Sequence, residues 1–119
     1  MKKLLSVGLL LASSFATSQV TATEMQCYVD TQAYDNYTSN RCLALNPASS
    51  TTASFRVTAT NGAINSVIWG DDTSSCGTAS TSCSIEVRAY RTYTGKATIL
   101  YTDGTWETVS AKASYERGF

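Results

Sequence analysis

The stretch GKATILYTDGTWETVSAKASY, residues 95–115, decides the fold of this chain. Apolar and polar residues alternate in both of its halves, with the apolar positions at Ala97, Ile99, Tyr101, Val109, Ala111, Ala113 and Tyr115. Such alternation predicts strands with one buried face. Asp103-Gly104 stands between the halves, and Asp-Gly is favoured in tight turns whose central residues have positive φ. We therefore predict a hairpin of strands 96–102 and 106–115.

The same alternation recurs toward the N-terminus and predicts further strands at 25–31, 41–45, 54–59, 64–69 and 85–90. Asn61-Gly62 predicts a second hairpin, and Tyr93-Thr94-Gly95 is expected to be a turn. The segments 32–40, 46–53 and 70–81 are expected to be loops. Thr, Ser, Tyr and Val are abundant and no helical periodicity is found. The sequence thus predicts an all-β fold, a small antiparallel β-sandwich of about six to seven strands.

The first residues have the form of an export signal. Met1-Lys2-Lys3 is cationic, Leu4–Ala12 is largely apolar, and Val20-Thr21-Ala22 resembles a signal-peptidase site. We predict a signal peptide at 1–22 and one domain at 23–119, secreted or periplasmic.

In an exported protein the four cysteines are expected to form disulfides, because the compartment is oxidising. Cys27, Cys42, Cys76 and Cys83 allow three pairings. Their spacing favours the local bridges 27–42 and 76–83 over crossed pairing. Zinc is disfavoured because neither CxxC spacing nor histidine is present.

Composition bears on function mainly by exclusion. Without Lys2 and Lys3, seven basic residues stand against nine acidic ones, which disfavours nucleic acid and anionic membranes as partners. No apolar run after the signal is long enough to span a membrane. The absence of histidine removes the usual general base, so we expect neither an enzyme nor a cofactor. Asp71, Asp72 and Asp103 could bind calcium, but a role as turn residues is favoured.

Aromatic and arginine residues form the most distinctive surplus. Tyr adds large contact area at low entropic cost, which suits an interface. We predict a partner-binding surface made of Arg88, Tyr90, Arg91, Tyr93, Tyr34 and Tyr37, with packing across strand pairs as the alternative. Trp69 is expected in the core, while Trp106 could be buried or exposed.

The region from Phe55 to Tyr115 resembles a bacterial immunoglobulin-like domain of exported or cell-surface proteins. Phe55 precedes Trp69 by fourteen residues, close to the spacing between the first core position and the buried tryptophan of such sandwiches. Residues 95–115 resemble their last two strands. The resemblance covers about half of the chain. It implies that Phe55, together with Tyr101 or Ile99, replaces the inter-sheet cysteines, and that this chain's own cysteines lie outside the core strands.

These inferences favour an exported, non-enzymatic domain that binds an extracytoplasmic protein or a surface glycan. The alternatives are a small carbohydrate-binding module, with Tyr90 or Trp106 stacking on sugar, and a hydrolase inhibitor that inserts the loop 76–83. The oligomeric state stays open.

Overall fold

A computed structural model describes residues 23–31, 35–58 and 61–118, so the predicted signal peptide lies outside the described residues. The described chain is all-β. Its elements are β1 (Glu24–Val29), β2 (Thr38–Ser39), β3 (Arg41–Leu45), β4 (Ser50–Thr58), β5 (Ile64–Asp71), the 3₁₀ turn η1 (Ser74–Cys76), β6 (Ser82–Arg88), β7 (Tyr93–Tyr101) and β8 (Trp106–Glu116). The expected number of six to seven strands is therefore wrong, since the described residues form eight. The additional short strand, β2, lies in a segment expected to be loop.

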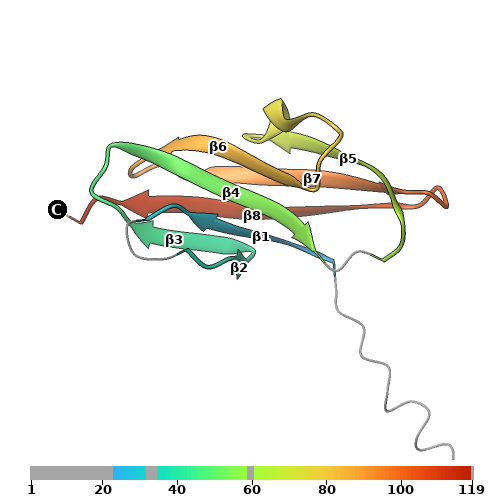
Figure 1. Ribbon diagram of the computed structural model, residues 1–119, viewed down its shortest axis with the longest axis horizontal. Coiled ribbons are helices and arrows are strands. Elements are labelled where there is room, and N and C mark those ends of the chain that lie inside the picture. Colours follow the sequence, from blue (N-terminus) through green and yellow to red (C-terminus); the bar gives the residue numbers. More distant parts are fainter. Residues whose placement is uncertain (1–22, 32–34, 59–60, 119) are drawn as a thin grey trace, which may run out of the picture.

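Two four-stranded sheets lie face to face (Figure 1). Sheet A has the order β2-β1-β4-β6, and sheet B has the order β3-β8-β7-β5. All pairs are antiparallel except β3 with β8, which is parallel. The sandwich therefore contains one parallel pair, at an edge of sheet B.

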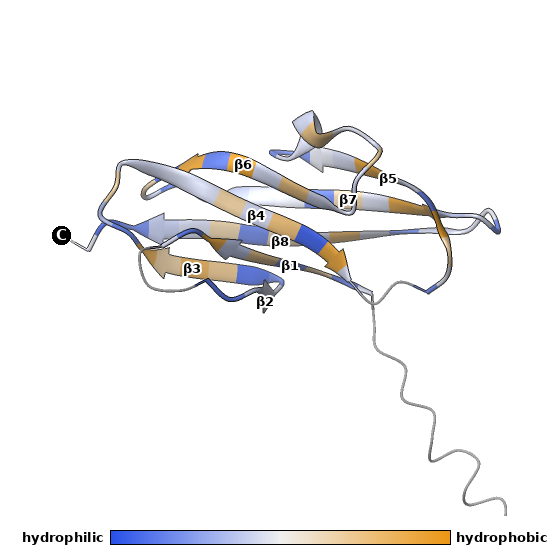
Figure 2. Cartoon of the chain, viewed as in Figure 1, coloured by the Kyte–Doolittle hydropathy of each residue, from blue (hydrophilic) through white to orange (hydrophobic). Residues whose placement is uncertain are grey.

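The core lies between the sheets, and polar and apolar residues alternate along most strands (Figure 2). The predicted inward positions of β7 and β8 are confirmed, with Ile99 at 0% and Tyr115 at 1% exposure. Val67 and Trp69 of β5 are buried as well. Alternation therefore identified the buried face of these strands.

The Asp103-Gly104 hairpin is confirmed. The two strands β7 and β8 pair from Tyr93↔Ala113 to Leu100↔Trp106. Gly104 has φ +93, a conformation that glycine adopts without steric cost.

The predicted Asn61-Gly62 hairpin is wrong, because β4 belongs to sheet A and β5 to sheet B. Both edges of β4 are already occupied, by β1 and by β6, so β5 pairs with β7 instead. The Asn-Gly segment thus belongs to a connection that crosses from one sheet to the other.

Several strand boundaries differ from the sequence prediction; for example, the strand expected at 85–90 is β6, Ser82–Arg88, and two other differences have a clear physical reason. β4 begins at Ser50, inside the segment expected to be a linker, because residues 50–53 pair with β6 and Ala53 is buried. Gly95 lies within β7 rather than in a turn. A Cβ on residue 95 would lie 2.5 Å from Cδ2 of Phe55, so the absence of a side chain there serves packing.

Phe55 is fully buried, and its ring lies against Gly95 of the other sheet. The void left by the missing Gly95 side chain is filled by the aromatic ring.

Both disulfides are local, as the favoured pairing predicts. Cys27–Cys42 joins β1 of sheet A to β3 of sheet B, and Cys76–Cys83 joins η1 to β6. The expectation that the cysteines lie outside the core strands is wrong, since Cys27, Cys42 and Cys83 are buried strand residues.

Candidate functional site

Residues 88–93, from the last residue of β6 to the first of β7, include four of the six predicted contact residues. Tyr93 is half-buried, and its hydroxyl accepts a hydrogen bond from the main-chain N–H of Arg88 at 3.0 Å. This bond closes the turn between β6 and β7, so the role of Tyr93 is to stabilise that turn. Arg88 and Arg91 are exposed beside it.

Tyr90 is the exposed aromatic residue of this turn, with 58% of its surface accessible. Its φ is +65°, a left-handed conformation that is uncommon for a bulky side chain. Its N–H donates to the carbonyl of Tyr115 at 2.8 Å, and its hydroxyl accepts from the N–H of Arg117 at 3.2 Å. Hydrogen bonds of its main-chain N–H and of its hydroxyl therefore both hold Tyr90 against the end of β8.

The turn is part of a larger surface. Arg117 Nε donates to the carbonyl of Pro47 at 2.8 Å, and the Ala89 N–H donates to the carbonyl of Ser49. We call Pro47, Arg88, Tyr90, Arg91 and Arg117 the β6–β7 end of the sandwich. Three of its five residues are cationic.

The buried neighbour of this end is Tyr115, whose hydroxyl donates to the carbonyl of Ala48 at 3.0 Å. Burial raises the pKa of Tyr115 above its ordinary value. The group therefore stays a neutral donor and fixes the loop after β3.

Tyr37 lies elsewhere, on the outer face of sheet A, and Tyr34 lies outside the described residues. The Arg56 guanidinium lies 3.7 Å from the centre of the Tyr37 ring, and Tyr28 meets that ring edge-on at 4.8 Å. Arg56 pairs with Ser82 at the start of β6, whereas Arg88 is the last residue of that strand. The structure therefore does not join Tyr37 to the β6–β7 end.

Arg56 was missed as a candidate, although the alternation of residues 54–59 already placed it outward. Gln26 Oε1 accepts from both Nε and Nη2 of Arg56, at 2.9 and 2.7 Å. These bonds hold the guanidinium over the Tyr37 ring, a contact between residues far apart in the sequence that only the structure reveals.

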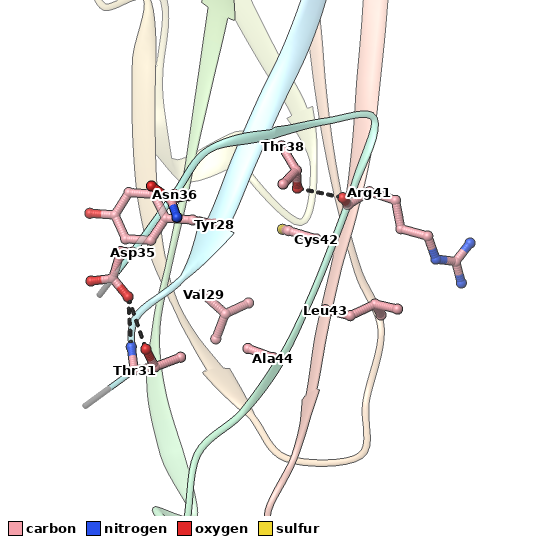
Figure 3. Close-up of a pocket in the computed structure, with 10 residues that line it drawn as sticks. All are labelled: Tyr28, Val29, Thr31, Asp35, Asn36, Thr38, Arg41, Cys42, Leu43 and Ala44. Atoms are coloured by element: carbon pink, nitrogen blue, oxygen red, sulfur yellow. Dashed lines mark hydrogen bonds between the residues drawn. The ribbon is translucent and has the colours of Figure 1, made fainter. Parts of the chain in front are cut away.

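A groove of about 430 Å³ lies between β3 and the segment after β1 (Figure 3). Tyr28, Asp35 and Asn36 lie on one side of it, Leu43 lies on the other, and Val29 and Ala44 lie between (Figure 3). Asp35 Oδ1 accepts from the N–H of Thr31 at 2.9 Å, which holds the far wall.

Asp35 also affects the carboxyl next to this groove. A hydrogen bond from Asp35 raises the pKa of Asp30 above its ordinary value, and loss of hydration adds to the effect. Both side chains are exposed, so water screens this carboxyl pair.

Two of the three loop carboxylates considered for calcium accept hydrogen bonds from main-chain amides. Asp72 Oδ2 accepts from the N–H of Thr94 at 2.8 Å, and Asp103 Oδ1 accepts from the N–H of Thr105 at 2.9 Å. Within residues 23–31, 35–58 and 61–118, no group of three or more His, Cys, Asp or Glu side chains could hold a metal ion.

The loop closed by Cys76–Cys83 lies along the edge of β5. The N–H groups of Trp69 and Val67 donate to the carbonyls of Gly77 at 3.1 Å and Thr78 at 3.4 Å. The indole N–H of Trp69 donates to the carbonyl of Ser80 at 2.8 Å. The loop thus covers this edge of sheet B.

Trp106 is 65% exposed, which decides the question left open by the sequence. It pairs with Leu100 across the hairpin. The neighbouring pair, Thr98 and Thr108, presents two hydroxyls 3.4 Å apart on the same face.

Fold and surface together define a small two-sheet β-domain with two local disulfides and exposed aromatic residues. Comparison with protein-family models, curated proteins and solved structures finds no match to this chain. Among the helices of the described region, none is long and apolar enough to cross a membrane.

Proposed function

We propose that this chain is an exported, non-enzymatic domain of the immunoglobulin-like class that binds a protein partner through its β6–β7 end. Its two disulfides suit an oxidising, extracytoplasmic compartment. The predicted signal peptide supplies the route.

Strand order supports the immunoglobulin-like class. The series β1-β4-β6 faces β5-β7-β8, which matches the A-B-E and C-F-G order of such sandwiches. Tyr93, at the start of β7, bonds back to Arg88 as the tyrosine corner of this class does. Two residues later Gly95 meets Phe55, where the class has its inter-sheet cysteines.

The conformation of Tyr90 carries the functional proposal. A left-handed non-glycine residue costs roughly 1–3 kcal/mol and persists only where its surroundings fix it. Here the surrounding hydrogen bonds maintain this conformation, and they keep an exposed tyrosine in one orientation. A rigid exposed aromatic flanked by arginines is the kind of residue that dominates binding interfaces.

The residue types of the chain favour a non-enzymatic function. The sequence has no histidine. The carboxyl pair Asp30–Asp35 is exposed, and the catalytic carboxyls of glycosidases need an enclosing cleft.

Affinity capture tests the proposal. The oxidised protein is immobilised and exposed to the secreted and envelope proteins of the producing cell. We expect a partner that is retained by the wild type and by Tyr37→Ala, and is lost with Tyr90→Gly. Equal retention by Tyr90→Gly and wild type would contradict a role of the β6–β7 end.

A second candidate is carbohydrate binding on the outer face of sheet B. The observation that favours it is Trp106, an exposed indole beside the Thr98 and Thr108 hydroxyls. Retention on polysaccharide that disappears with Trp106→Ala, but survives Tyr90→Gly, would select this candidate over the first. No observation similarly favours the hydrolase-inhibitor alternative.

A further inference from the structure

Strand β3 lies at an edge of sheet B, and its outer side is not paired with another described strand. The N–H of Lys112 donates to the carbonyl of Asn40, and the N–H of Asn46 donates to the carbonyl of Glu116, both at 3.0 Å. Even-numbered residues of this segment therefore bond to β8. Alternate residues of a strand direct their main-chain groups to opposite edges, so Arg41, Leu43 and Leu45 direct theirs away from β8.

The groove in Figure 3 lies between this edge, at Leu43 and Ala44, and the side chains of Tyr28, Asp35 and Asn36. In the part of the chain that the structure describes, β8 is the one strand paired with β3. The Thr38 hydroxyl donates to the carbonyl of Arg41 at 2.7 Å (Figure 3), so the edge is accessible to another strand at Leu43 and Leu45.

The other long edges are protected in ways that β3 is not. The loop after η1 covers β5 through Gly77 and Thr78. The outward positions of β6 are polar or charged, including Glu86 and Arg88, which discourages pairing.

By contrast, β3 is apolar after its first residue (Figure 2). Leu43 and Leu45 are each 67% exposed. An exposed apolar edge strand is a template for pairing with another chain.

Charge indicates which chain fits. At one end of the β3–β8 pair Arg41 lies beside Lys112, and at the other end Leu45 lies beside Glu116. Like charges on neighbouring strands repel. A second copy in antiparallel orientation would bring Arg41 of each copy toward Glu116 of the other.

We propose that two copies of this chain pair through β3, antiparallel and two-fold symmetric, with Leu43 opposite Leu43 of the second copy. Sheet B then continues through both copies. Arg41 lies opposite Leu45 of the second copy, one strand away from Glu116 of that copy. Two strand spacings put their Cα atoms about 10 Å apart, within reach of an arginine and a glutamate side chain. Such self-complementary two-fold contacts are the commonest form of association among soluble proteins.

Sedimentation equilibrium of the chain, expressed from its full sequence and purified in oxidised form, tests the pairing. We expect a concentration-dependent shift to twice the monomer mass, lost in Leu43→Lys and kept in Ile68→Lys. Ile68 is a matched control because it is an exposed apolar residue, 43% accessible, on β5 of the same sheet. A wild type that stays monomeric up to about 1 mM, where even weak complexes form, would overturn the proposal.

The register is tested by cross-linking. In an antiparallel bonded pair the facing Cα atoms are about 5.5 Å apart, which suits a disulfide. Leu43→Cys should therefore cross-link two copies through residue 43. Leu45→Cys is equally exposed, but its two copies would lie about 14 Å apart and should stay unlinked. Linking of Leu45→Cys alone would exclude this register.

Charge exchange separates self-pairing from the addition of another protein's strand. Arg41→Glu alone and Glu116→Arg alone should each weaken the dimer, because each places like charges at both ends. A mixture of the two variants should restore a heterodimer. Failure of the mixture to associate would contradict pairing between two copies. Tyr90-dependent binding is measured by the separate capture experiment, so failure of the pairing and failure of the proposed function give different results.

Discussion

The ring of Phe55 packs so closely on Gly95 that a Cβ on residue 95 would lie 2.5 Å from Cδ2 and 2.7 Å from Cε2. This contact joins sheet A to sheet B at the centre of the core. Substitution at this glycine is therefore limited by the ring rather than by backbone conformation.

We predict that Gly95→Ala destabilises the domain by about 1–3 kcal/mol, because the added methyl group displaces a fully buried ring. Urea unfolding measures the change. Gly70→Ala in β5 is the matched control, since a Cβ there meets nothing within 4 Å. Equal stability of the two variants would contradict the close approach.

Because Tyr90 has a left-handed conformation, we expect glycine to be more stabilising than alanine at this position. Alanine is usually favoured over glycine in ordered backbone, but at φ +65° glycine avoids a steric cost. Tyr90→Gly should therefore be more stable than Tyr90→Ala by about 1 kcal/mol. Thermal unfolding of both variants checks this, and a more stable alanine variant would show that residue 90 is not strained.

Glu107 should make stability depend on acid pH. Its carboxylate accepts hydrogen bonds from Tyr101, Asn61 and Thr23, and the bond from Tyr101 contributes most to lowering the pKa of Glu107 below its ordinary 4.5. A carboxyl with a lowered folded-state pKa contributes stability that is present above its unfolded pKa and lost as pH falls.

The wild type should therefore lose stability as pH drops below about 4.5, and Glu107→Gln should lose less over that interval. Tyr101→Phe removes the strongest donor and should also flatten the profile. Unfolding free energies measured from neutral to acid pH check the result; parallel profiles for wild type and Glu107→Gln would exclude this carboxyl as the cause.

The two disulfides should contribute unequally. Cys27–Cys42 closes a loop of 15 residues and Cys76–Cys83 a loop of 7. Chain entropy assigns about 3 kcal/mol to the first loop and about 2 kcal/mol to the second. Replacing each pair by alanine and measuring unfolding without reductant tests the order. A larger loss from the 76–83 pair would show that loop length does not govern the effect.

Features set by neighbouring residues were predictable from the sequence. Asp103-Gly104 joins strands that are adjacent in the chain and in the sheet, so its turn preference and the pairing agree. Both disulfides close short loops, and their spacing predicted them.

Features set by distant residues were not predictable in this way. Asn61-Gly62 has the composition of a hairpin turn, but β1 and β6 occupy both edges of β4. Gly95 has the composition of a turn, and only the position of Phe55 explains its place in a strand.

At the candidate site, outward alternation predicted the exposure of Tyr90. Its left-handed backbone had no local signal, since it depends on contacts with Tyr115 and Arg117. The stacking of Arg56 on Tyr37 likewise required strands that are far apart in the sequence.

The covalent link between β1 and β3 has a mechanical consequence. A pull between the two ends of the described domain passes from Glu24 through Cys27–Cys42 into β3, and leaves through the end of β8. Because β3 and β8 are parallel, these opposed forces run along the two strands. The hydrogen bonds between them are then loaded together in shear rather than opened one after another. We therefore expect the β3–β8 pair to resist tension along the length of the domain.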